Sequence, residues 1–76
     1  MPYKLNQLVR ATKHISGSMT KDWIYKIVKI ESPEFSRYLT AKDSPWLPEK
    51  DLQYVYWIKR NEQISVTLHE NVTPYD

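Results

Sequence analysis

The chain is predicted to be a small all-β domain, and three features of its sequence support this. Turn-forming residues recur about every ten positions, which is the spacing of a small barrel or sandwich. The segments between the turns are rich in β-branched and aromatic residues, which favour strands. Residues 44–58 combine two prolines with four aromatic rings, in a pattern that predicts a short 3₁₀ turn leading into a strand.

Length and composition limit what such a domain can be. The 76 residues make a single domain over positions 1–76, and a chain this short buries only about 60% of its unfolded surface. No cysteine is present to form a disulfide or a thiolate metal site, so ten aromatic residues are expected to supply much of the core. There is little room for a deep active-site cleft.

The first strand is expected over Leu5–Lys13. Alternate residues share a face there, with Leu5, Gln7, Val9 and Ala11 on one side. The loop Ile15–Asp22 follows and contains Gly17, the only glycine in the chain.

The second strand is expected over Trp23–Glu31, where the apolar residues change parity between Ile27 and Ile30. A bulge there would turn Tyr25, Ile27 and Ile30 inward, and without one the strand must be buried on both faces. Ser32–Glu34 ends the strand because proline lacks the N–H that a strand ladder needs.

The middle of the chain leaves one alternative open. Ser32–Glu34 can also start one helical turn through Phe35, with the serine as N-cap and the proline in the first helical position. A short third strand is expected over Arg37–Ala41. Across Trp46–Leu52 a brief 3₁₀ turn is favoured, because Pro48 would clash with the preceding turn of an α-helix. Trp46 is expected to lie in the core near Leu52.

The last two strands form a predicted hairpin. A three-residue loop, Asn61–Gln63, sets Ile58 opposite Val66 and Tyr56 opposite Leu68, which gathers these four apolar side chains on one face. A two-residue loop would set Ile58 opposite Ser65, so the pattern favours the longer loop. The other face then carries Trp57, Lys59 and His69, among other residues.

The order and spacing of several short motifs resemble the small SH3-like barrels of bacterial and phage proteins. The motifs are Asn6–Ala11 in place of a first strand G-D-x-V-R-V, Tyr25–Ile30, Tyr38–Leu39, and Trp46–Leu52 as a W-x-x-E-x-D-L turn. The resemblance covers residues 4–53 and implies an SH3-like barrel with an added C-terminal hairpin. It also implies an accessory or host-directed role in a phage or mobile element. Asn6 stands where that family usually has glycine.

Catalytic chemistry is not expected. His14 and His69 lie in ordinary loop or strand positions without a nucleophile and an orienting group, so both are interpreted as solvated surface residues. No metal or cofactor site and no small-molecule substrate are predicted, and the absence of an apolar leader or spanning segment predicts a cytoplasmic protein without a membrane partner. The chain is therefore expected to be a non-enzymatic binding module.

Protein binding is the leading expectation, because the chain has more aromatic rings than so small a core needs. Trp57 is the main candidate, with the alternative that another strand or the C-terminal tail covers it. The predicted contact residues are Trp57, Lys59, Trp23, Ser18, Met19 and Lys21.

Two further partners stay open. Single-stranded nucleic acid would bind basic residues that converge on one face. The alternative is a solvated strand face whose lysines protect strand edges from aggregation. The candidate residues are Arg10, Lys13, Lys26, Lys29 and Arg37. The C-terminal hairpin can also complete the barrel, extend a sheet, or present an edge to a second copy as a homodimer contact.

Overall fold

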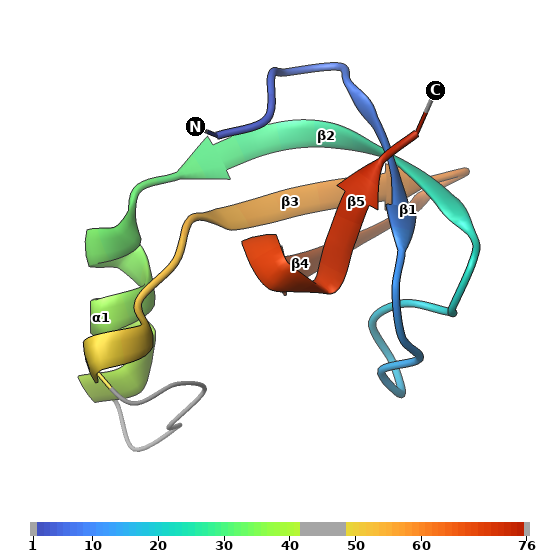
Figure 1. The fold of residues 1–76 in the computed structure, drawn as a ribbon. Helices are drawn as coiled ribbons and strands as arrows, with labels where there is room; N and C mark the ends of the chain where they lie inside the picture. The colour runs from blue at the N-terminus through green and yellow to red at the C-terminus, as the bar shows by residue number, and fades with distance from the viewer. Residues whose placement is uncertain (1, 42–48, 76) are drawn as a thin grey trace.

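A computed structural model of the chain describes residues 2–41 and 49–75. Its strands form one antiparallel five-stranded sheet in the order β4-β3-β2-β1-β5. One helix, α1, lies at the end of the sheet away from the β3–β4 turn, beside η1 (Figure 1). The elements are β1 (Leu8–Ala11), β2 (Ile24–Glu31), α1 (Pro33–Ala41), η1 (Glu49–Asp51), β3 (Val55–Arg60), β4 (Gln63–Leu68), η2 (His69–Asn71) and β5 (Val72–Pro74). The all-β prediction is confirmed, with one short helix added.

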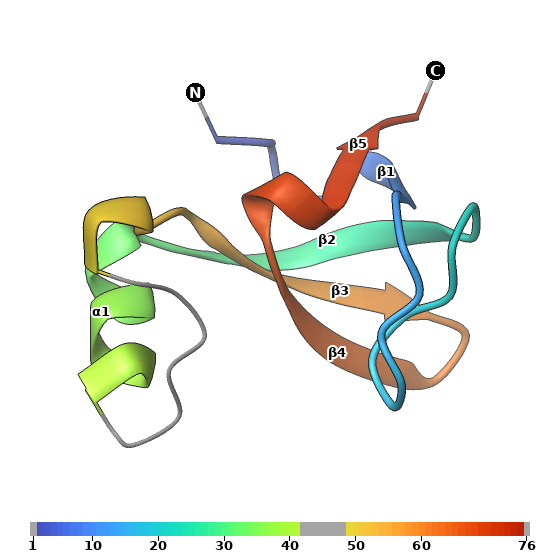
Figure 2. The same ribbon diagram turned by 60° about the horizontal axis from the view of Figure 1, so that its bottom comes forward.

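The sheet is strongly curled, because its two edge strands are close neighbours along the chain. Only η2, a 3₁₀ helix of three residues, separates β4 at one edge from β5 at the other (Figure 2). Hydrogen bonds hold η2 to the residues that flank β3 and β1. The N–H of His69 donates to the carbonyl of Tyr54, just before β3, at 3.0 Å, and the N–H of Thr12, just after β1, donates to the carbonyl of Asn71 at 2.9 Å. The apolar core fills the concave side.

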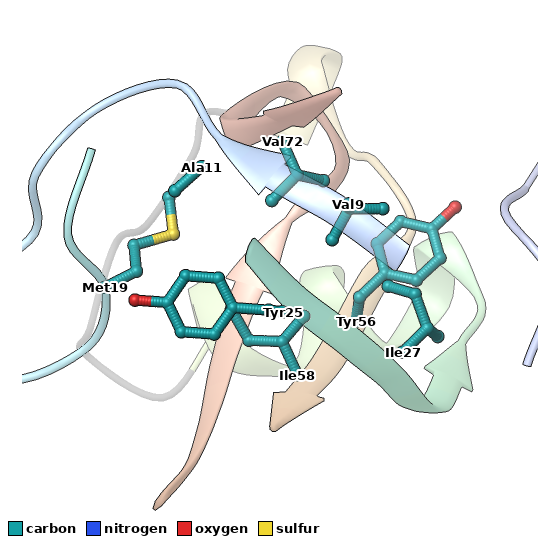
Figure 3. Packing of buried hydrophobic residues seen from close by; sticks show 8 residues of the cluster. All are labelled: Val9, Ala11, Met19, Tyr25, Ile27, Tyr56, Ile58 and Val72. Carbon is teal, nitrogen blue, oxygen red and sulfur yellow. The ribbon is translucent and has the colours of Figure 1, made fainter. Parts of the chain in front are cut away.

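The core confirms the predicted faces of the first two strands. Its buried side chains come from four strands and the first loop, and Figure 3 shows Val9, Ala11, Met19, Tyr25, Ile27, Tyr56, Ile58 and Val72 packed together. The predicted bulge is also present, because the pairing of β2 with β3 shifts between Ile27 and Lys29. It turns Ile30 toward the core after Tyr25 and Ile27.

The first strand is shorter than predicted, because a turn occupies residues 5–6. Asn6 has φ 68°, in the left-handed region that asparagine tolerates better than most residues. Its N–H donates to the carbonyl of Ile27 at 2.8 Å, which holds the turn against β2. An asparagine therefore adopts here a conformation for which glycine is the usual residue.

The predicted third strand, Arg37–Ala41, is wrong: these residues form the second half of α1. The helical turn suggested at Ser32–Glu34 does form, with the N–H of Phe35 donating to the carbonyl of Ser32 at 2.9 Å, and it continues for two more turns. Stacking of Phe35 on Tyr38 at helical i, i+3 spacing, with ring centroids 6.0 Å apart, favours this continuation. The predicted 3₁₀ turn is confirmed at η1, while Trp46 and Pro48 lie outside the described residues.

The predicted three-residue hairpin loop is also wrong. The loop has two residues, Asn61 and Glu62, so Ile58 pairs with Ser65 and Trp57 with Val66. Asn61 has φ 56°, and tight two-residue hairpin turns require a positive φ at the first loop position. The prediction counted apolar matches across the strands and missed that asparagine can supply this conformation.

The hairpin turn gives a stability prediction. Replacing Asn61 with alanine is expected to lower the free energy of unfolding by about 1 kcal/mol, because alanine pays the steric penalty of a left-handed conformation. Replacing Asn61 with glycine serves as the control and is expected to leave stability unchanged or slightly raised. Urea denaturation followed by tryptophan fluorescence measures both variants, and an equal loss in the glycine variant would contradict the turn geometry.

Candidate functional site

The convex face of the sheet, on the side away from the core, gathers four exposed basic side chains. They are Arg10 of β1, Lys26 and Lys29 of β2, and Lys59 of β3. Strand register brings them together: Lys26 lies opposite Leu8 on one side and opposite Lys59 on the other. We call this surface, with the aromatic residues described next, the basic face.

The bulge in β2 is what puts two of these lysines on one face. Residues three apart on a regular strand point to opposite faces. The extra residue at the bulge restores the parity, so Lys26 pairs with Lys59 and Lys29 pairs with Trp57, all on the convex side. Without the bulge, Lys29 would point toward the core.

Aromatic rings accompany the cations. The Lys29 ammonium lies 5.3 Å from the ring centroid of Trp57, and the Arg10 guanidinium lies 5.5 Å from that of Tyr75. Both distances fit cation–π contact. Lys29 also forms an ion pair with Glu31 at 3.1 Å, and Glu31 is the only acidic residue in the five strands.

Trp57 is half-buried rather than fully exposed. Its neighbours on the convex side are Lys29 across β2 and Val66 across β4. The indole nitrogen Nε1 is buried and has no hydrogen-bond partner, which is unfavourable for a polar group. Trp57 therefore contributes a partly covered ring to the basic face.

Two of the predicted nucleic-acid residues lie elsewhere. Lys13 follows β1 and lines a groove at the β4 edge, while Arg37 belongs to α1. Lys59, expected as a protein contact, joins the basic face instead. Tyr75 was not predicted as a site residue. It lies beside Arg10 because β5 pairs with β1, and β5 has only three residues, the last of them proline, so the sequence does not indicate a strand there.

The predicted protein-contact residues do not form one surface. Met19 is 3% exposed and packs in the core, where Figure 3 shows it directed toward Ala11 and Tyr25. The Ser18 hydroxyl donates to the carbonyl of Val66 at 3.3 Å. Trp23 is 44% exposed and carries the Arg60 guanidinium 4.2 Å from its ring centroid, and Lys21 is exposed in the first loop.

His69 is not the solvated residue that its strand position suggested. It begins η2, where its ring stacks on Tyr3 with centroids 4.6 Å apart, and its Nδ1 lies 2.9 Å from the Tyr56 hydroxyl. The Tyr56 hydroxyl also accepts the N–H of Tyr3 at 2.9 Å, so this one hydroxyl joins the backbone of Tyr3 to the ring of His69. Burial lowers the pKa of His69 and raises that of Tyr56, which keeps both groups neutral.

Comparison with known protein families, curated proteins and solved structures finds no match. Within residues 2–41 and 49–75, no group of three histidine or carboxylate side chains is arranged to hold a metal ion. No helix in the same part of the chain is long and apolar enough to cross a membrane.

Proposed function

We propose that this chain is a non-enzymatic domain that binds single-stranded nucleic acid across the basic face. The observation that carries the proposal is the position of Lys26 directly opposite Lys59 on two neighbouring strands, with Arg10 and Lys29 on the same face. The predicted protein-binding role rests on Trp57, which is half-buried in this arrangement.

The lysine pair is unfavourable for the folded sheet by itself. Like charges directly opposite each other on a sheet are destabilising. Exposed lysines often protect edge strands from aggregation, but β2 and β3 are interior strands of this sheet, so that explanation does not apply to Lys26 and Lys59. An anionic partner would neutralise the two ammonium groups, and relief of their repulsion would favour binding.

The aromatic rings support a single strand over a duplex. Bases of a single strand can stack on aromatic side chains while the phosphates meet cations, at about 1–3 kcal/mol per stacked base. Tyr75 is 41% exposed and Trp57 lies between Lys29 and the β4 edge, so the two rings flank the cations of the face.

We also propose that the curled sheet is an SH3-like barrel. It is supported by the curl that brings the two sheet edges within three residues of each other at η2. Barrels of this kind host many functions, so the proposed binding rests on the basic face and not on the fold.

A titration with a labelled single-stranded oligonucleotide of about 20 nucleotides tests the function, read by fluorescence anisotropy at several salt concentrations. The plot of log affinity against log salt is expected to have a slope of about −3, the value for four phosphate contacts on a single strand. The double variant Lys26→Glu, Lys59→Glu is expected to bind at least about tenfold more weakly, with a shallower slope.

The matched control is Lys21→Glu, Lys50→Glu, which changes the net charge equally at exposed lysines outside the face. It is expected to retain most of the affinity. Absence of binding at low salt would reject the proposal, and equal losses in the two double variants would show attraction to net charge without a site.

A further inference from the structure

We propose that the free edge of β4 binds an extended peptide segment of a partner protein, which adds to the sheet as a sixth strand. The binding site is the groove between β4 and the first loop, which we call the β4 groove. It is lined by Lys13, Ile15, Ser18, Val66, Thr67, Leu68, Glu70 and Asn71. Of the basic residues discussed above, this groove uses only Lys13, so the inference goes beyond nucleic-acid binding.

Backbone groups of β4 point away from β3 at this edge. In an antiparallel ladder, hydrogen-bonded and non-bonded pairs alternate. The N–H of His69 donates to the carbonyl of Tyr54, so every second residue back along β4, beginning with Thr67, is hydrogen-bonded to β3. The alternate residues direct their N–H and C=O groups away from β3. These residues are Ile64, Val66 and Leu68.

One contact already imitates strand addition. The Ser18 hydroxyl donates to the carbonyl of Val66 at 3.3 Å, which is long for a hydroxyl hydrogen bond. It occupies the position that a backbone N–H of an added strand would take. This weak contact covers the carbonyl while leaving it available to a better donor.

The edge also lacks the devices that usually protect edge strands. The six residues of β4, Gln63–Leu68, include no charge, proline or glycine, and Ile64 is 55% exposed. Short, uncharged segments of high β-propensity pair readily with other strands. The opposite edge strand, β5, ends in Pro74, which has no N–H to offer.

The groove has the size and chemistry for a single peptide strand. Its volume is about 390 Å³, at the small end of the range for ligand sites. Thr67 is one of the lining residues and only 2% exposed, and its buried hydroxyl has no hydrogen-bond partner. Ile15 and Leu68 offer apolar contact for one side chain of the peptide, and the charges of Lys13 and Glu70 suit a segment that also carries both signs.

A second copy of this chain fits the same site poorly. The first loop contacts β4 through the Ser18 hydroxyl, and a single extended chain needs less space beside this loop than the hairpin of a second copy would. The occupant is therefore a segment that is extended and free of its own sheet, which is the usual ligand in β-strand addition.

Selection from a random-peptide phage library on the immobilised full chain, followed by calorimetry with the selected synthetic peptide, tests the inference. Val66→Pro removes an N–H that points away from β3, so the β3–β4 ladder is retained while peptide affinity is expected to fall about fivefold or more. Ser18→Ala removes the competing donor and is expected to raise affinity about two- to tenfold. Ser16→Ala, at an exposed serine in the same loop, is the matched control and should leave affinity unchanged.

The selected peptides are expected to alternate apolar and polar residues. Failure to select any peptide, or equal binding by the wild type and the Val66 and Ser18 variants, would overturn the inference. A dimer in sedimentation that is lost in Val66→Pro would also overturn it, because the edge would then serve a second copy. If Val66→Pro does not fold, the rise in affinity with Ser18→Ala decides the question alone.

Discussion

Replacing Ile58 with alanine is expected to lower the free energy of unfolding by about 2–5 kcal/mol, the cost of deleting a large aliphatic side chain from a packed core. Ile58 is fully buried and belongs to the core cluster shown in Figure 3. A domain of this size is only marginally stable, so a loss at the upper end of this range would leave the chain largely unfolded at room temperature. Chemical denaturation followed by circular dichroism measures the loss.

Ile64→Ala is the matched control, because it deletes the same atoms from the same hairpin. Ile64 pairs with Lys59 on the convex side and is 55% exposed, so the expected change is within about 0.5 kcal/mol. The three-residue loop predicted from the sequence would instead set Ile64 on the same face as Ile58. Losses of similar size in the two variants would therefore favour that register over the observed one.

The fold was predictable wherever local patterns agree with burial. Alternation placed Val9 and Ala11 in the core, and the parity change after Ile27 predicted the bulge. Prediction from local patterns failed where two interpretations competed. At Ser32–Glu34 a helix begins, and it occupies the residues of a predicted strand. Prediction failed again at Asn61, since the backbone conformation of one loop residue, and not the apolar pattern, sets the hairpin register.

The candidate site was predictable as a set of residue types but not as a surface. The sequence supplied Arg10, Lys26 and Lys29 as candidates, and the strand order that brings them beside Lys59 depends on long-range pairing that no short pattern encodes. The β4 groove was not predicted. It requires the first loop to reach β4 from a position 48 residues away along the chain, through Ser18 and Val66.

Replacing Tyr56 with phenylalanine is expected to lower the free energy of unfolding by about 1–3 kcal/mol. The Tyr56 ring is fully buried, and its hydroxyl joins two otherwise unpaired groups, the N–H of Tyr3 and Nδ1 of His69. Removing the hydroxyl leaves both without a partner while the ring still fills the core. Tyr75→Phe removes a hydroxyl from a residue that is 41% exposed and is expected to change stability little, so an equal loss there would contradict the role of this hydrogen-bond pair.

The same cluster predicts how stability changes with pH. Burial lowers the pKa of His69 in the folded chain below its ordinary value of 6.5, so the unfolded chain binds a proton that the folded chain resists. Stability is therefore full above about pH 6.5 and falls as the pH drops toward the folded-state pKa. His69→Asn removes the imidazole that takes up this proton, so the acid-side loss should be smaller in that variant. Denaturation curves between about pH 5 and 8 measure it, and an identical acid-side loss in wild type and His69→Asn would place the responsible group elsewhere.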